Sequence, residues 1–207
     1  MTTKRITWTD TNGIVCVATP APEAMSALTG TGGNLHSNHI EKQAAAYVTA
    51  GMSSASALKL ATAYANGGLN EADALDLIWQ RTLAYQEKKG DNPSNVTQIE
   101  AESLPYFGSF GRAAWKQDGA TAPVFDMEKA RTIKTDQIRP ERDKKLAALD
   151  IEYIRADEAG DADKKQSIAT VKQKLRDIPE TIQSDLNALD TPDALEKFTP
   201  TWPTEGE

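Results

Sequence analysis

The feature that most constrains this chain is a charge-dense segment in its second half. Residues 126–177 hold 13 basic and 12 acidic side chains, which is 25 of the 53 charges in about a quarter of the length. Their apolar residues recur at helical spacing in two narrow stripes, and such stripes between charged flanks are typical of an antiparallel helical hairpin or a coiled-coil-like pair. The stripes are Met127, Ala130, Ile133, Ile138, Leu146, Leu149, Tyr153 and Ala156, and then Ile168, Val171, Leu175 and Ile178.

Prolines and glycines predict where these helices end. The break at Gly160-Asp161 separates the two stripes. Pro140 is expected to divide or kink the first helix, because its ring clashes with the preceding turn, and Pro179 is expected to end the second. A less regular helix over 180–189, a short helix from Thr191-Pro192 through Phe198 and an extended tail over 199–203 follow.

The N-terminal region predicts a β-hairpin followed by a short helix. Two β-prone runs, 6–8 and 14–18, flank an Asn-Gly turn, which is the strongest short-range hairpin signal in a sequence. Proline ends the second run, and a helix over 23–28, begun by Pro22 and closed by Gly30, leads into a loop at 31–34.

Residues 38–89 predict three helices. Asn38 is expected to cap the first, which runs to Ala50, and Ser53 or Ser54 starts the second, which ends at 66–68. Asn70, followed three residues later by an acidic residue, starts the third. Its apolar residues spread over a wide arc, so we expect it to be packed on two sides.

Strand character returns at 96–99 and in a second hairpin, where 113–116 and 123–125 flank the turn at 117–119. The sequence therefore predicts an α+β fold, mostly α, with a small antiparallel β region, an inserted helical subdomain and a C-terminal charged helical hairpin. The expected segments are 1–30 (hairpin and short helix), 31–92 (helical subdomain), 93–126 (β-hairpin region) and 127–207 (helical hairpin arm with an extended Trp-Pro tail).

Composition narrows the function classes. The formal charge of −7 disfavours general attraction to nucleic acid or anionic membranes. A single cysteine excludes an internal disulfide and a thiolate zinc site, and the longest apolar runs, of five residues, are far too short to cross a membrane. The first residues contain no apolar stretch of the length of a secretory signal, so we expect the protein to stay where it is synthesised.

We expect no catalytic, cofactor or metal site. His36 and His39, with Glu41 nearby, lack the further ligand that zinc needs and are better interpreted as solvated histidines at a helix start. Cys16 lies in an apolar strand with no activating base. The glycine-rich loop at 30–33 lacks the Gly-Lys-Ser/Thr of a phosphate loop and is interpreted as a flexible connection. Carboxylates of the charged arm alternate with bases and form a solvated face.

Several short motifs, in order, resemble a known family. They are Phe110-Gly111-Arg112-Ala113-Ala114-Trp115-Lys116, the run Val124–Arg131, the run Leu146–Tyr153 with Arg155-Ala156, the run Lys172–Asp177 and the Pro-bounded Trp202. This series resembles the C-terminal module of the phage tail assembly chaperone-like proteins of tailed bacteriophages, and 6–23 resembles the start of such proteins. The likeness covers about half of the chain, and the helical block 38–89 departs from the pattern.

The resemblance implies a non-enzymatic role in tail or tail-fibre assembly, with other tail or tail-fibre proteins as partners, in the host cytoplasm. The alternative is a structural component of the mature virion tail, at the tail tip, baseplate or fibre attachment, with a homo-oligomer as a further option. We expect the stripes to be under-buried in the monomer and to hold a partner. The expected partner-binding residues are Leu146, Leu149, Tyr153, Val171, Leu175 and Trp202.

Overall fold

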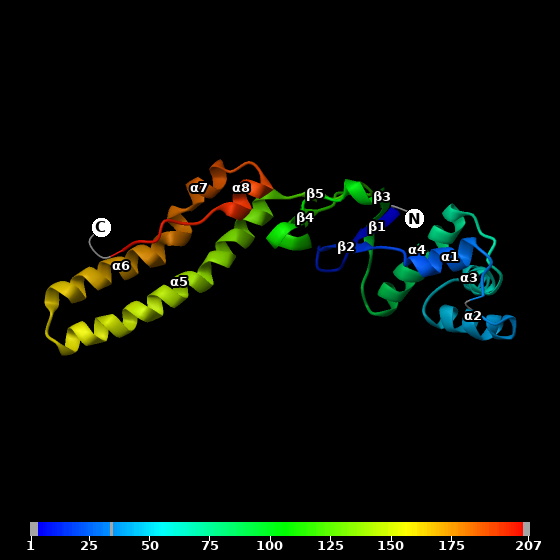
Figure 1. Ribbon diagram of the computed structural model, residues 1–207, viewed down its shortest axis with the longest axis horizontal. Helices are drawn as coiled ribbons and strands as arrows, with labels where there is room; N and C mark the ends of the chain where they lie inside the picture. Colours follow the sequence, from blue (N-terminus) through cyan, green and yellow to red (C-terminus); the bar gives the residue numbers. More distant parts are fainter. Residues whose placement is uncertain (1–3, 34, 205–207) are drawn as a thin grey trace. The chain divides into compact units, whose positions relative to one another are not determined.

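The computed structural model describes residues 4–33 and 35–204. It is mostly helical, with a three-stranded and a two-stranded antiparallel sheet, which confirms the expected α+β fold (Figure 1). Residues 1–3, Asn34 of the expected loop and residues 205–207 of the expected tail segment lie outside the described residues. The chain forms two compact units: unit 1 comprises 1–105 and 115–124 as far as they are described, and unit 2 comprises 106–114 and 125–207 likewise.

The sheet of unit 1 is built on the expected N-terminal hairpin. Strands β1 (Lys4–Thr9) and β2 (Val15–Ala18) pair antiparallel about the Asn-Gly turn. Strand β3 (Ser94–Glu100) contains the expected strand at 96–99 and pairs antiparallel with the other edge of β1, which gives the order β2-β1-β3.

Helix α1 (Pro22–Thr29) begins with Pro22 and is followed by Gly30, as expected. The glycine loop after it makes backbone hydrogen bonds to the end of α3 and to the residues that follow it. The Gly33 N–H donates to the Ala65 carbonyl at 3.0 Å, and the Gly68 N–H donates to the Gly30 carbonyl at 3.0 Å. Gly32 has φ +72°, and a Cβ there would lie 2.5 Å from the Ala65 oxygen, so only glycine allows this crossing.

Three helices follow: α2 (Ile40–Thr49), α3 (Ser54–Asn66) and α4 (Glu71–Lys88). Ser53 caps α3 and Asn70 caps α4 through side-chain oxygens, as expected. The expected cap at Asn38 is wrong. Asn38 lies inside a 3-10 turn, η1 (Ser37–His39), so α2 begins only after it and has no side-chain cap.

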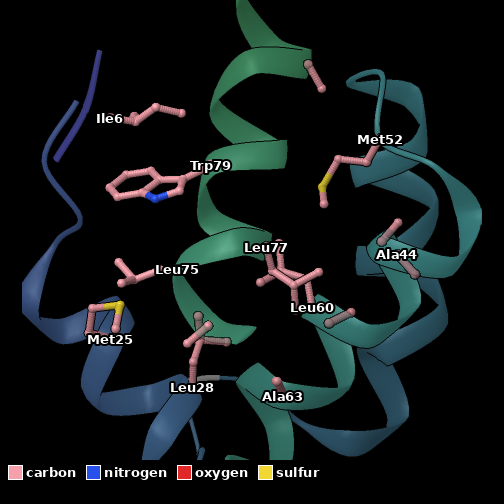
Figure 2. Packing of buried hydrophobic residues seen from close by; sticks show 14 of the residues in the cluster. Ile6, Met25, Leu28, Ala44, Met52, Leu60, Ala63, Leu75, Leu77 and Trp79 are labelled. Carbon is pink, nitrogen blue, oxygen red and sulfur yellow. The ribbon is translucent and has the colours of Figure 1, made fainter. Parts of the chain in front are cut away.

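Helix α4 is packed on two sides, as its wide apolar arc predicts. Figure 2 shows Trp79 and Leu75 turned toward Ile6 and Met25, and Leu77 turned the other way among the residues of the neighbouring helices. The Trp79 indole N–H also donates to the Gln98 side chain of β3 at 2.9 Å. The helices of 31–92 therefore share one hydrophobic core with the sheet.

The second hairpin is shorter than expected. The 3-10 turns η2 (Ala101–Ser103) and η3 (Gly108–Ala114) precede it, so Ala113 and Ala114 are not in a strand, and only β4 (Trp115–Lys116) and β5 (Val124–Phe125) pair. Ala113 and Ala114 end η3 instead, and Ala114 is fully buried in the second core. Gln117 of the expected turn instead covers the edge of β3, donating to the Asn95 carbonyl at 2.6 Å. Segment 93–126 is thus divided between the two units.

Unit 2 contains the helices α5 (Met127–Glu158), α6 (Ala162–Thr181), α7 (Gln183–Ala188) and α8 (Pro192–Lys197). The short helix through 197 and the non-helical tail after it agree with the prediction, and α5 and α6 lie side by side (Figure 1).

Pro140 lies inside α5, so the expectation that it divides the helix is wrong, and Pro179 lies inside α6, so the expectation that it ends the helix is wrong. An interior proline removes one backbone hydrogen bond and costs about 3 kcal/mol. Here Ile138, two residues before Pro140, and Ile178, next to Pro179, are buried in the second core. We attribute the continuity of both helices to this packing.

Candidate interaction surface on the helical arm

The helical arm, which we define as α5 and α6, is closed by a turn that its sequence specifies. Gly160, at φ +69°, follows α5, its N–H donates to the Asp157 carbonyl, and the Asp161 N–H donates to the Ala156 carbonyl. This pattern is a Schellman motif, which favours glycine at its left-handed position. The Asp161 carboxylate then caps α6 by accepting from the Lys164 N–H at 2.9 Å. The two helices are therefore antiparallel.

The predicted partner-binding residues of the two stripes face the inside of the hairpin. Val171 and Leu175 are 5% and 1% exposed, and Leu146, Leu149 and Tyr153 are half-buried. The expectation that the stripes are under-buried in the monomer is wrong for Val171 and Leu175. Each stripe covers the other, because a stripe this narrow needs only one facing helix. Whether any of these five residues binds a partner stays a prediction.

Charged contacts hold the distal end of the arm. Lys172 pairs with Asp150, and Lys165 pairs with Asp157, so each ion pair joins α6 to α5. The hydrogen bond with Asp157 raises the pKa of Lys165. Both lysine nitrogens also lie over the Tyr153 ring, at 5.5 Å for Lys165 and 5.2 Å for Lys172. Tyr153 is thus enclosed by contacts of its own chain.

Trp202, the predicted docking residue of the tail, packs on its own chain. It is half-buried beside the second core, and the Lys145 nitrogen lies 5.0 Å from its ring centroid. The prediction left open whether this aromatic residue docks on its own chain or on a partner. Within the described residues, Trp202 docks on its own chain.

Glu196 of α8 connects this helix to the rest of unit 2 through hydrogen bonds. Its carboxylate accepts from the Tyr106 hydroxyl and from the Ser109 N–H at 2.8 Å, and its backbone carbonyl accepts from the Lys134 ammonium at 2.7 Å. The Tyr106 hydrogen bond lowers the pKa of Glu196, while the same bond raises the pKa of Tyr106. Burial lowers the pKa of Lys134. This network joins η3, α5 and α8.

The outward face of α5 carries apolar residues that the sequence analysis missed. Ile151 and Ile154 are 55% and 57% exposed, and Ala147 and Ala148 beside them are also exposed. Their spacing of three and four residues places them on one helical face, on the side away from Leu149 and Tyr153. A search for a second apolar row, running parallel to the inner stripe, would have found them.

The end of the arm is acidic. Between residues 150 and 163, six carboxylates accompany one base, Arg155. Arg155 and Glu158 lie beside the two isoleucines on the same exposed face. The arrangement can therefore make apolar and charged contacts with another protein surface.

The histidine pair and the single cysteine that the sequence analysis considered lie in unit 1. The His36 and His39 rings lie 6.3 Å apart between centroids, and the part of the chain that the structure describes contains no cluster of three His, Cys, Asp or Glu residues able to hold a metal ion. Cys16 is half-buried in β2. No helix in the described residues is long and apolar enough to cross a membrane.

Comparison with family models, with curated proteins and with solved structures finds no match for this chain.

Proposed function

We propose that this chain is a non-enzymatic bacteriophage tail protein that acts in tail or tail-fibre assembly through protein contacts. The observation that supports a contact role is the exposure of Ile151 and Ile154 on the outward face of α5. Exposed apolar residues with charged neighbours are typical of protein-binding surfaces. The tail setting is supported by the ordered motifs between Phe110 and Trp202.

In this role the arm presents a firm helical face to another protein chain. The inner stripes keep the two helices together, and the outward face is left for the partner. Binding to a preformed helix avoids the entropy cost of ordering a flexible segment. The site of action would be the host cytoplasm during assembly, with the virion tail as a second location.

The alternative is a structural component of the mature virion tail. The observation that favours it is the complete hydrophobic core of unit 1, because a finished helical unit can pack permanently between copies. An assembly factor would instead leave the particle when assembly ends.

Quantitative mass spectrometry separates the two roles by comparing purified particles with the infected-cell lysate. Three or six copies per particle would identify a structural component, while abundance in the lysate and absence from particles would identify an assembly factor. Absence from particles together with no co-purifying tail or tail-fibre protein in the lysate would contradict the proposal.

A further inference from the structure

The outward face of α5 has the residue spacing of a helix-pairing seam. Lys144, Ala147 or Ala148, Ile151, Ile154 and Glu158 recur at intervals of three and four residues. This is the spacing by which one helix packs along another. All of these side chains are exposed, so the seam has no partner within the described residues of the chain.

Two charges on this face, those of Lys144 and Glu158, are placed symmetrically about Ile151. Lys144 precedes it by seven residues and Glu158 follows it by seven, so each lies about 10 Å along the helix from Ile151. Neither side chain forms an ion pair within the described residues. If a second α5 lies antiparallel with Ile151 opposite Ile151, each Lys144 lies opposite a Glu158. A parallel arrangement would instead place like charges together.

The sizes of the apolar residues on the two sides of Ile151 are complementary in the same arrangement. Ala147 and Ala148 lie four and three residues before Ile151, and Ile154 lies three residues after it. In the antiparallel arrangement, each Ile154 therefore meets the small alanines of the other helix. Large residues opposite small ones allow two helices to approach closely.

We propose that the partner of this face is a second copy of the chain, bound through an antiparallel α5–α5 contact centred on Ile151. This proposal identifies the partner of the outward face. It rests on the proposed function only for the premise that this face binds a protein. The contact is isologous, since the same residues serve both copies. Its apolar part is small compared with stable interfaces, which bury about 1,200–2,000 Å² in total, so the dimer forms reversibly with concentration.

Sedimentation equilibrium of the full chain over a range of concentrations tests the contact. The wild type is expected to shift from monomer to dimer mass as concentration rises. Ile151→Asp places two carboxylates at the centre of the contact and should weaken dimerisation by about tenfold or more, since each tenfold is only about 1.4 kcal/mol. Leu58→Asp is the matched control, because Leu58 is 50% exposed but lies on α3, and it should leave the dimer unchanged.

Charge reversal tests the orientation. Lys144→Glu and Glu158→Lys should each weaken self-association, because each creates like-charge pairs at both ends. Combining both changes in one chain restores the pairs in the antiparallel arrangement and should restore the dimer. Lys42→Glu, at an exposed position of α2, controls for net charge. In a parallel dimer the doubly changed chain would gain nothing over the single variants, and that result would overturn the proposed register.

A wild type that stays monomeric at all concentrations, or a dimer that Ile151→Asp leaves intact, overturns this inference. Either result leaves the proposed function standing if the chain is still found in particles or with tail proteins. A dimer that fails in the expected variants, in a chain found neither in particles nor with tail proteins, supports this inference and contradicts the proposed function.

Discussion

Replacing Leu175 by alanine tests whether the inner stripe holds the arm together. Leu175 is 1% exposed and contacts the second core together with Val171 and Ile178. Truncating a fully buried leucine removes its transfer free energy and leaves a cavity, and such changes cost about 2–5 kcal/mol. We expect a loss in this range from the free energy of unfolding of unit 2.

The matched control is Ile154→Ala, measured in dilute solution where the chain is monomeric. Ile154 is 57% exposed on the outward face of the same hairpin. Substitutions at such positions change the free energy of unfolding by no more than about 0.5 kcal/mol. The two variants thus differ in which side of the hairpin they alter.

Hydrogen exchange followed by mass spectrometry measures the exchange rate of each peptide in both variants. Leu175→Ala should speed exchange in peptides from α5 and α6 and leave peptides from β1 and α4 at the wild-type rate, because these belong to different compact units. Equal effects of the two variants would refute the assignment of inner and outward faces. Equal acceleration in unit 1 would refute the independence of the two cores.

Three further changes test local features of the fold. Asp161→Ala removes the cap of α6 and should cost about 1 kcal/mol in urea unfolding of unit 2. Gly32→Ala should lower the thermal midpoint of unit 1, since its φ of +72° and the Ala65 oxygen leave no room for a Cβ. The pKa of Glu196 is lowered, so its contribution to stability is full above the ordinary value of 4.5 and disappears as pH falls through the folded value. The gap in thermal midpoint between wild type and Glu196→Gln should accordingly narrow below pH 4.5, and a constant gap would argue against the Tyr106 contact.

Local signals in the sequence predicted most of the elements. Asn12-Gly13 fixed the first hairpin, Ser53 and Asn70 fixed two helix starts, and the break at Gly160 fixed the turn of the arm. Each of these depends on the residue itself and its nearest neighbours along the chain.

The wrong predictions, and the features for which no prediction was made, depended on contacts between distant residues. Pro140 and Pro179 break isolated helices, but burial of neighbouring isoleucines keeps α5 and α6 continuous. The pairing of β3 with β1 joins residues about ninety positions apart, and the sequence of neither strand identifies the other as its partner. Propensity is a weak guide wherever tertiary packing competes with it.

The candidate surface was mislocated for a related reason. The inner stripe follows helical spacing along most of α5, and a stripe of this kind is the side that paired helices bury against each other. Ile151 and Ile154 lie in the same segment but outside this stripe. Only the packing of α5 on α6 distinguishes the covered side from the outward side.

Photo-cross-linking in producing cells tests the central claim, that the outward face of α5 is a protein-contact surface. A photoreactive amino acid at position 151 is compared with the same residue at position 58, which is similarly exposed on α3. The account predicts specific products at position 151, to a second copy of the chain or to a tail protein, and none of these at position 58. No product at position 151, or the same products at both positions, would contradict it.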